Sequence, residues 1–217
     1  MKDLVILGAG GFAREVLWLI HRINQIEKQW NVLGFISSGH DSSTKMIDGY
    51  PLLGDDEEVG NYSDAFFICT VGSAKKRKNI IQKLKSSIPD IKFATLVDPS
   101  VIISESVQIG EGSCICASTI LTVNISIGNH VHINLGCTVG HDAIIKDYVT
   151  VYPGVNISGA VKIESCTELG TGGQIIQGIC VGANSIIGAG STVIRDIPSD
   201  CTAVGSPAKV VKINESK

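Results

Sequence analysis

The sequence predicts two consecutive units: a small Rossmann-like α/β domain over residues 1–95, followed by a parallel β-helix over residues 96–217. Three observations lead to this prediction. Large aliphatic residues recur at every sixth position in the second unit. In the first unit, apolar runs alternate with segments of helical spacing. With 44% hydrophobic residues in a chain of 217, both units have enough apolar side chains to build a core.

The first unit begins with the segment "DLVILGAGGFAREVLWLI". It predicts a buried strand, a glycine turn and then a helix, whose apolar positions Val16, Leu19, Ile20 and Ile23 follow three-four spacing. Further strands are expected over 31–37, 65–72 and 91–97, and a second helix over 74–87. This alternation of strands and helices is typical of an α/β domain with a parallel sheet.

The glycine turn predicts a ligand site. Glycines let the backbone approach a ligand, and the amide groups at the start of a helix can bind an anion such as a pyrophosphate. The pattern differs from the dinucleotide fingerprint, because Ala13 replaces the third glycine and no acid follows the second strand. A nicotinamide dinucleotide and a plain tight turn remain alternatives, and we favour a nucleotide-linked ligand. The residues concerned are Gly8, Gly10, Gly11, Ser37 and Ser38.

The second unit has a period of six residues, which is neither helical nor a simple strand alternation. It predicts one short strand and one tight turn per repeat, with the aliphatic residue pointing inward and glycine often easing the corner. The phase is unbroken, so no inserted loop is expected. The aliphatic positions are Val97, Ile103, Ile109, Ile115, Leu121, Ile127, Ile133, Val139, Ile145, Val151, Ile157, Ile163, Leu169, Ile175, Val181, Ile187 and Val193.

Three such repeats would make one eighteen-residue coil of a triangular prism. Successive coils stack at the strand spacing of about 4.8 Å, so the five to six coils expected here form a rod roughly 25–30 Å long.

Composition excludes several classes of function. The net charge is −3, which argues against nucleic acid or an anionic membrane as partner. The N-terminal apolar run of four residues is too short for a signal peptide or a membrane span, so we expect a cytoplasmic protein. The seven cysteines form no CxxC pair and lack histidines at zinc-finger spacing, which predicts buried thiols and no metal. They are Cys69, Cys114, Cys116, Cys137, Cys166, Cys180 and Cys201.

Seven segments, taken in order, resemble one family of bacterial enzymes. They are "GAGGFARE", "GFISS", "IDGYPLLGDDE", "TVGSAKKRK", "FATLVDPS", "VGHDAIIKDYV" and "VGSPAK". The resemblance covers almost the whole chain. It is to the hexapeptide-repeat sugar acetyltransferases, which include sialic acid O-acetyltransferases and UDP-4-amino-sugar or GDP-perosamine N-acetyltransferases.

The resemblance implies a left-handed β-helix, acetyl-CoA as the donor, and a homotrimer with active sites between neighbouring β-helices. It also implies that the N-terminal domain holds a nucleotide-linked sugar, that His141 is the general base and that Asp142 raises its basicity. We therefore expect substrate contacts at Gly8, Gly10, Gly11, Ser37, Ser38, Gly72 and Asn134, and acetyl-CoA contacts at Thr150, Gly159 and Lys209.

Three positions depart from the family pattern. Family members usually carry two aspartates where Ser37 and Ser38 stand, which leaves the identity of the nucleotide open. They often carry histidine in place of Asp98. Some also carry a second histidine, close to the acetyl group, nine positions after the base, where this chain has Thr150.

The chemistry of His141 supports the same role independently. It follows Gly140 at a predicted corner, where side chains point out of the prism. Acetyl transfer from a thioester requires removal of one proton from the acceptor, and imidazole titrates near neutral pH. The neighbouring Asp142 can fix the ring tautomer and favour the imidazolium. Gly159 lies one coil above, and its amide could bind the oxyanion.

Other functions are weighed against this one. Covalent catalysis by Cys137 or Cys166 is disfavoured because Cys137 takes an inward position. A β-helical zinc enzyme would need three converging histidines, and we expect His130 and His132 to be surface or subunit-contact residues instead. The predicted function is N-acetylation of a nucleotide-linked amino sugar in surface-glycan biosynthesis. The alternatives are O-acetylation of a sialic-acid-like sugar and non-catalytic binding of a sugar nucleotide.

Overall fold

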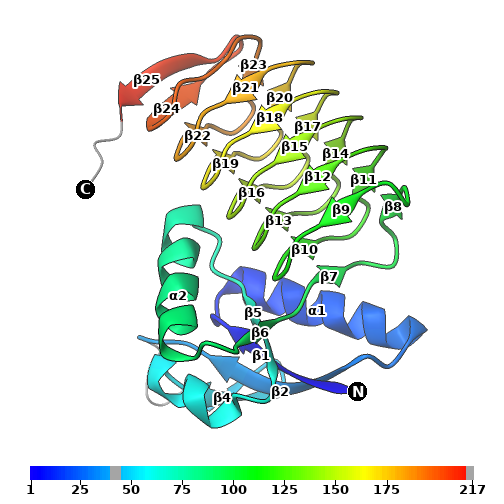
Figure 1. Cartoon of the computed structure of the whole chain (residues 1–217), viewed down its shortest axis with the longest axis vertical. Helices are drawn as coiled ribbons and strands as arrows, with labels where there is room; N and C mark the ends of the chain where they lie inside the picture. The colour runs from blue at the N-terminus through cyan, green and yellow to red at the C-terminus, as the bar shows by residue number, and fades with distance from the viewer. Residues whose placement is uncertain (40–44, 214–217) are drawn as a thin grey trace.

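A computed structural model describes residues 1–39 and 45–213 and stacks a β-helix on an α/β domain (Figure 1). The α/β domain lies at the bottom of the view, and the coils of the β-helix rise above it. Its elements are β1 (Lys2–Leu7), α1 (Gly11–Ile26), β2 (Trp30–Ile36), β3 (Met46–Ile47), β4 (Tyr50–Gly54), the 3-10 helix η1 (Asp56–Tyr62), β5 (Phe66–Cys69), α2 (Ala74–Ser87) and β6 (Lys92–Phe93).

The sheet of the α/β domain has the strand order β3-β4-β2-β1-β5-β6 and is parallel except for the β3–β4 pair. The sequence did not lead us to expect β3, β4 or η1. The turn between β3 and β4 is Asp48-Gly49, and both residues have positive φ, of 45° and 85°. An Asp-Gly pair is a strong signal for a two-residue hairpin turn, so this hairpin could have been predicted.

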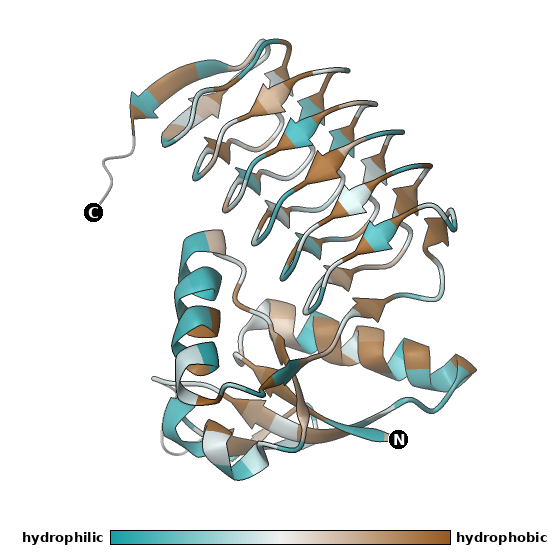
Figure 2. Cartoon of the chain, viewed as in Figure 1, coloured by the Kyte–Doolittle hydropathy of each residue, from teal (hydrophilic) through white to brown (hydrophobic). Residues whose placement is uncertain are grey.

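Both predicted helices form. The apolar side chains of α1, including Val16, Leu19, Ile20 and Ile23, are buried as expected. Figure 2 shows that α1 carries large hydrophobic stretches, whereas α2 is mostly hydrophilic. The difference arises because α1 packs between the sheet and the β-helix, while α2 leaves much of its surface exposed.

The β-helix consists of seventeen two-residue strands, and each one ends on a predicted aliphatic position. They form three parallel sheets, of which two are β23-β20-β17-β14-β11-β8 and β21-β18-β15-β12-β9, while the third contains β22-β19-β16-β13-β10-β7. Partner residues are eighteen apart, as in the pair Val139 and Ile157, so the predicted β-helix is confirmed. The strands are β7 (Leu96–Val97), β8 (Ile102–Ile103), β9 (Gln108–Ile109), β10 (Cys114–Ile115), β11 (Ile120–Leu121), β12 (Ser126–Ile127), β13 (His132–Ile133), β14 (Thr138–Val139), β15 (Ile144–Ile145), β16 (Thr150–Val151), β17 (Asn156–Ile157), β18 (Lys162–Ile163), β19 (Glu168–Leu169), β20 (Gln174–Ile175), β21 (Cys180–Val181), β22 (Ile186–Ile187) and β23 (Thr192–Val193).

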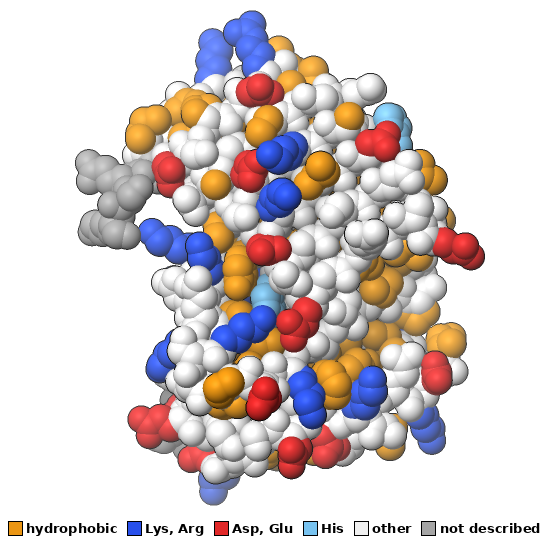
Figure 3. Space-filling view, in the orientation of Figure 1, with side chains coloured by type: hydrophobic (Ala, Val, Ile, Leu, Met, Phe, Trp, Pro, Cys, Tyr) orange, Lys and Arg blue, Asp and Glu red, His pale blue; other side chains and the backbone are white. Residues whose placement is uncertain are grey.

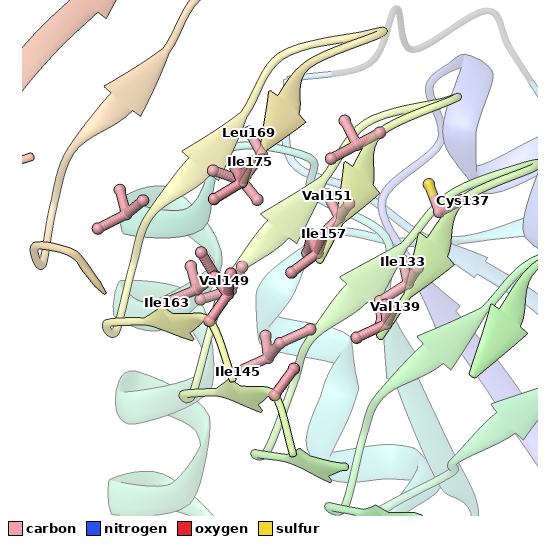
Figure 4. Close-up of a cluster of buried hydrophobic side chains, with 14 of the residues drawn as sticks. Ile133, Cys137, Val139, Ile145, Val149, Val151, Ile157, Ile163, Leu169 and Ile175 are labelled. Atoms are coloured by element: carbon pink, nitrogen blue, oxygen red, sulfur yellow. The ribbon is translucent and has the colours of Figure 1, made fainter. Parts of the chain in front are cut away.

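The inside of the prism is filled by the aliphatic residues of all three sheets (Figure 4). Figure 4 shows Ile133, Val139 and Ile145 below the equivalent residues of later coils. Cys137 fills a small inward position and is fully buried, as predicted. Burial raises the pKa of its thiol to about 11, so it is a poor nucleophile at neutral pH.

The last two strands close the β-helix. β24 (Cys201–Val204) continues the third sheet in parallel beside β22, and β25 (Lys209–Ile213) folds back antiparallel to β24. No helix within the described residues is both long and apolar enough to cross a membrane. On the face in Figure 3, basic and acidic side chains are interspersed and form no single-sign patch.

The predicted strand over 91–97 is divided between the two units. Its first part is β6, the edge of the α/β sheet, and its second part is β7, the first strand of the prism. An apolar cluster then joins the units, because α1 side chains pack with Leu96, Cys114 and Cys116. The α/β domain therefore covers the outer surface of the β7–β10–β13–β16–β19 sheet.

Arg77 of α2 is a second link between the units, and its side chain is fully buried. Its guanidinium donates hydrogen bonds of 2.7–3.1 Å to the β5–α2 loop and to the prism. Burial lowers the pKa of Arg77 to about 10, so it remains charged at neutral pH. The acceptors are the carbonyl oxygens of Val71, Gly72, His130, Tyr148 and Val149 and the hydroxyl of Thr150.

Candidate active site

His141 and Asp142 form a hydrogen-bonded pair at the corner between β14 and β15. Nδ1 of His141 lies 2.8 Å from Oδ2 of Asp142, and the two side chains are 52% and 56% exposed. The backbone of Asp142 has φ of 61°, a left-handed conformation that aspartate tolerates better than most residues. This corner geometry turns the carboxylate back toward the preceding imidazole.

The carboxylate of Asp142 is ionised at neutral pH. It accepts hydrogen bonds from His141 and, at 3.3 Å, from Nδ2 of Asn124 one coil below, and these bonds hold the pKa of Asp142 below its ordinary value. Because the carboxylate accepts the proton of Nδ1, Nε2 of the neutral imidazole is left with a lone pair. In this tautomer Nε2 has no hydrogen-bond partner among the described residues and can accept a proton.

Gly159 lies directly beside this nitrogen. Any side chain on Gly159 would overlap the His141 ring, and a side chain on Gly140 would overlap the backbone at Gly159. The expected neighbourhood of His141 and Gly159 therefore exists in the structure. The oxyanion role of the Gly159 amide stays a prediction.

A first pocket, of about 150 Å³, lies at the carboxyl ends of β1 and β2. It brings together three predicted residues, Gly8, Ser37 and Ser38, and adds the carboxylate of Asp56 from η1. Gly8 has φ of 105° and lies so close to Thr70 that a side chain would collide with it. Nothing in the sequence pattern pointed to Asp56, because η1 was not expected.

Gly10 and Gly11 occupy the start of α1. Gly10 is the N-cap residue, and Gly11 is the first residue of the helix. A side chain added at either position would meet nothing within 4 Å, so internal packing does not require glycine there. Open space in front of a helix N-terminus leaves room for an anionic group.

A second pocket, of about 110 Å³, lies between the α/β domain and the prism; we call it the His132 pocket. It brings together three more predicted residues, Gly72, Asn134 and Thr150. The Thr150 hydroxyl is buried and donates a 2.7 Å hydrogen bond to the Gly72 carbonyl. Four further residues complete the wall: Phe12, Glu15, His132 and Tyr152.

The expectation that His130 and His132 lie on the surface is wrong, because each is only 1% exposed. His132 does point outward from the prism, but the α/β domain covers it, and its ring centroid lies 5.0 Å from that of Phe12. His130 is stacked on Tyr148 at 5.4 Å and meets Phe93 edge-on at 4.7 Å. Burial lowers the pKa of His130 to about 3 and that of His132 well below its usual range.

Lys209, expected to contact acetyl-CoA, lies on exposed β25 at the opposite end of the prism from the α/β domain (Figure 1). Thr150, also assigned to acetyl-CoA, lines the His132 pocket together with Gly72 and Asn134, which are expected to contact the substrate. Within residues 1–39 and 45–213, no group of three or more histidine, cysteine, aspartate or glutamate residues could hold a metal ion.

Known proteins resemble both units. The family model of the PglD N-terminal domain matches residues 3–84 of this chain. GDP-perosamine N-acetyltransferase of Escherichia coli O157:H7 is 28% identical over 216 residues, which cover 95% of each chain. WeeI from Acinetobacter baumannii AYE superimposes with a TM-score of 0.84 at 30% identity, over 97% of this chain and 100% of its own.

A further solved structure is a histidine-to-asparagine mutant of perosamine N-acetyltransferase from Caulobacter crescentus, in complex with CoA and GDP-perosamine. It superimposes with a TM-score of 0.88 at 26% identity, over 97% of each chain. This chain belongs to the hexapeptide-repeat sugar acetyltransferases. The family, and the left-handed β-helix that the resemblance to it implied, are thereby confirmed.

In this acetyltransferase the predicted site residues fall into separate groups. The two pockets adjoin the α/β domain, which covers the sheet that contains β13 and β16. His141 and Asp142 instead lie at the corner where the other two sheets meet, between β14 and β15. A single chain thus has the His141–Asp142 pair and the two pockets on different sides of the prism.

Proposed function

We propose that the enzyme transfers the acetyl group of acetyl-CoA to the amino group of a nucleotide-linked amino sugar. The observation that carries this proposal is the exposed His141–Asp142 pair, with a free Nε2 beside Gly159, in a chain related to GDP-perosamine N-acetyltransferase. The complex of its relative with CoA and GDP-perosamine supports the same pair of substrates.

In the proposed mechanism both substrates bind before any bond forms. The amine attacks the thioester carbonyl, and Nε2 of His141 takes the proton that the nitrogen loses as the C–N bond forms. The amide of Gly159 stabilises the oxyanion of the tetrahedral intermediate. Collapse of that intermediate breaks the C–S bond, and the sulfur leaves with the proton held by His141. Asp142 keeps the imidazole oriented and stabilises its charged form.

We also propose that the functional enzyme is a homotrimer in which each site uses two subunits. The arrangement of residues supports this: the two pockets lie on one side of the prism and His141 on another. A neighbouring chain related by three-fold symmetry would bring its His141 corner to the pockets of the first chain. We place the nucleotide at the first pocket, with Gly8, Ser37 and Ser38, and the sugar toward the His132 pocket.

The test is a screen of acceptors, in which release of free thiol from acetyl-CoA is measured with GDP-, UDP- and dTDP-linked 4-amino sugars. Matched sugars with a hydroxyl in place of the amine distinguish N- from O-acetylation. Turnover of an amino sugar with formation of the amide is expected. Turnover of hydroxyl sugars alone would show an O-acetyltransferase. Binding of a sugar nucleotide without turnover of any acceptor would contradict the proposed enzyme activity.

A further inference from the structure

The His132 pocket has the dimensions of a subsite. Its volume of about 110 Å³ equals that of three to four water molecules at roughly 30 Å³ each, so it can admit one edge of a sugar ring but not a whole nucleotide. Phe12 and Glu15 come from α1, Gly72 from the β5–α2 loop, and the remaining residues from β13 and β16 or just after them. Both units of the chain therefore build the pocket.

His132 is the unusual residue in this wall. Neither ring nitrogen of His132 has a hydrogen-bond partner among the described residues, although the side chain is almost completely buried. Most buried polar atoms in proteins are paired, and an unpaired one destabilises the fold. His132, unlike the equally unpaired His130, lines this pocket, so a ligand bound there would lie next to the unpaired ring.

The chemistry of the surroundings limits what that ligand can be. Burial and the nearby charge of Arg77 lower the pKa of His132, so the ring is neutral, with one nitrogen as donor and the other as acceptor. The backbone of Cys69 opposes this shift, but it does not meet hydrogen-bond geometry with either ring nitrogen. Phe12 adds an apolar wall. A neutral hydroxyl group on a sugar ring suits a neutral imidazole and an apolar wall. An anion suits them less well, because it would need a cationic partner.

We propose that His132 is a substrate-binding residue that forms a hydrogen bond with one hydroxyl of the acceptor sugar ring. This inference rests on the proposed function, because it assigns the pocket to the sugar of the nucleotide-linked substrate. The same bond makes His132 a determinant of specificity, since a site built to bond a hydroxyl discriminates against a sugar that lacks it.

His130 provides a matched control. It is as deeply buried as His132, its ring nitrogens also lack partners, and it lies two residues away on the same covered side of the prism. It does not line the His132 pocket, however, but packs between Phe93 and Tyr148. His132→Phe and His130→Phe thus make the same chemical change inside and outside the pocket.

The experiment uses the nucleotide sugar that the wild-type enzyme turns over fastest in the acceptor screen, and analogues that lack one ring hydroxyl at a time. Dissociation constants are measured by calorimetry for wild type, His132→Phe and His130→Phe. We expect one analogue to bind the wild type about 10–100-fold more weakly than the parent sugar. In His132→Phe, parent and analogue should bind equally weakly, while His130→Phe should behave as wild type.

His132→Asn covers the case in which the larger phenylalanine merely obstructs the pocket. The amide can still bond a hydroxyl, so this variant should retain part of the preference for the parent sugar. The inference is overturned if no analogue loses affinity for the wild type, or if His132→Phe keeps the wild-type preference, or if both phenylalanine variants lose it equally. Any of those three results would leave the proposed acetyl transfer standing. Failure of every acceptor in the screen would instead refute the proposed function and this inference together.

Discussion

At the scale of single residues, the site depends on a few backbone and side-chain positions at one corner of the prism. The positive φ of Asp142 brings its carboxylate to 2.8 Å from His141, and the absence of a side chain at Gly159 leaves space for the imidazole. Both features follow from residue type at fixed places in a regular coil. Each can be tested by a single substitution.

His141→Ala should lower kcat by about 10²–10⁴, the usual contribution of a general base. The melting temperature should stay near that of wild type, because the side chain is half exposed and packs in no core. His21→Ala serves as control, since His21 is an exposed histidine on α1 that bonds only to Tyr50 in the described part of the chain. Retention of most activity at neutral pH on a verified acceptor would mean that the pair has no catalytic role.

Gly159→Ala should lower kcat by about 10² or more, because the new methyl group must displace the His141 ring and small misplacements of catalytic groups are costly. Affinity for the nucleotide sugar should change little. Steady-state kinetics check this, with Gly60→Ala as control, because a side chain at Gly60 meets nothing within 4 Å. Equal kinetics for the two variants would place the reacting atoms away from Gly159.

At the scale of secondary-structure elements, the contact between α2 and the prism determines the geometry of the pockets. Arg77 ties the β5–α2 loop to the turns before β13 and β16. Glu168 of β19 adds a carboxylate at the start of α2, where it accepts a 2.9 Å hydrogen bond from the Ala74 amide. The Gly72 carbonyl, which lines the His132 pocket, is held between Arg77 and Thr150.

Arg77→Met should lower the free energy of unfolding by about 3 kcal/mol or more, because several buried carbonyl groups lose their donor. Arg77→Lys should not restore it fully, since an ammonium cannot reproduce the planar fork of donors. Chemical denaturation measures both, with Lys76→Met as control at an exposed position of the same helix. If Arg77→Met were as stable as Lys76→Met, the hydrogen bonds would contribute little to the contact.

The two buried histidines should make the fold sensitive to mild acid. Their pKa values are lowered in the folded state, to about 3 for His130, whereas unfolded histidine titrates near 6.5. Between these values the unfolded chain binds protons that the folded chain does not, so the free energy of unfolding falls as the pH falls. At most, each histidine lowers the free energy of unfolding by about 1.4 kcal/mol for every unit by which the pH falls.

Urea unfolding at pH 7, 6 and 5 checks this expectation, because ordinary carboxyl groups scarcely titrate in that range. His130→Phe should reduce the slope by about the contribution of one histidine. An unchanged slope in this variant would mean that His130 is not held neutral by the fold.

At the scale of the whole molecule, the chain separates the His141–Asp142 pair on one side of the prism from the two pockets on another. The predicted trimer should give a light-scattering mass of about three times the 22.9 kDa of one chain. A monomer at micromolar concentration would contradict it.

A complementation experiment tests whether sites are shared between subunits. Chains carrying His141→Ala and chains carrying Gly10→Trp, which would block the open space at the start of α1, are each expected to be inactive. If each site combines the pockets of one subunit with His141 of another, random assembly of equal amounts of the two chains should recover about a quarter of the wild-type activity, because half of the pockets are intact and half of their neighbours carry His141. No recovery in trimers shown to be mixed would mean that each chain forms its site alone.

The sequence by itself determined the repeating part of the protein. Every marker from Val97 to Val193 lies at the end of a strand, because the six-residue period records a local requirement for one inward aliphatic side chain per face. It also determined both helices and the corner position of His141, since these depend on residues close together in the chain. The β3–β4 hairpin was missed, although its Asp-Gly turn carries a recognisable local signal.

Only the tertiary structure decided which outward face of the prism is covered. His132 and Thr150 take the same outward position in their coils as exposed residues of the other sheets, and they are buried because the α/β domain lies against their sheet. Contact between segments far apart in sequence leaves no period or spacing in the chain. The same contact creates the His132 pocket and the cluster of acceptors around Arg77, so these features required the packed structure to be seen.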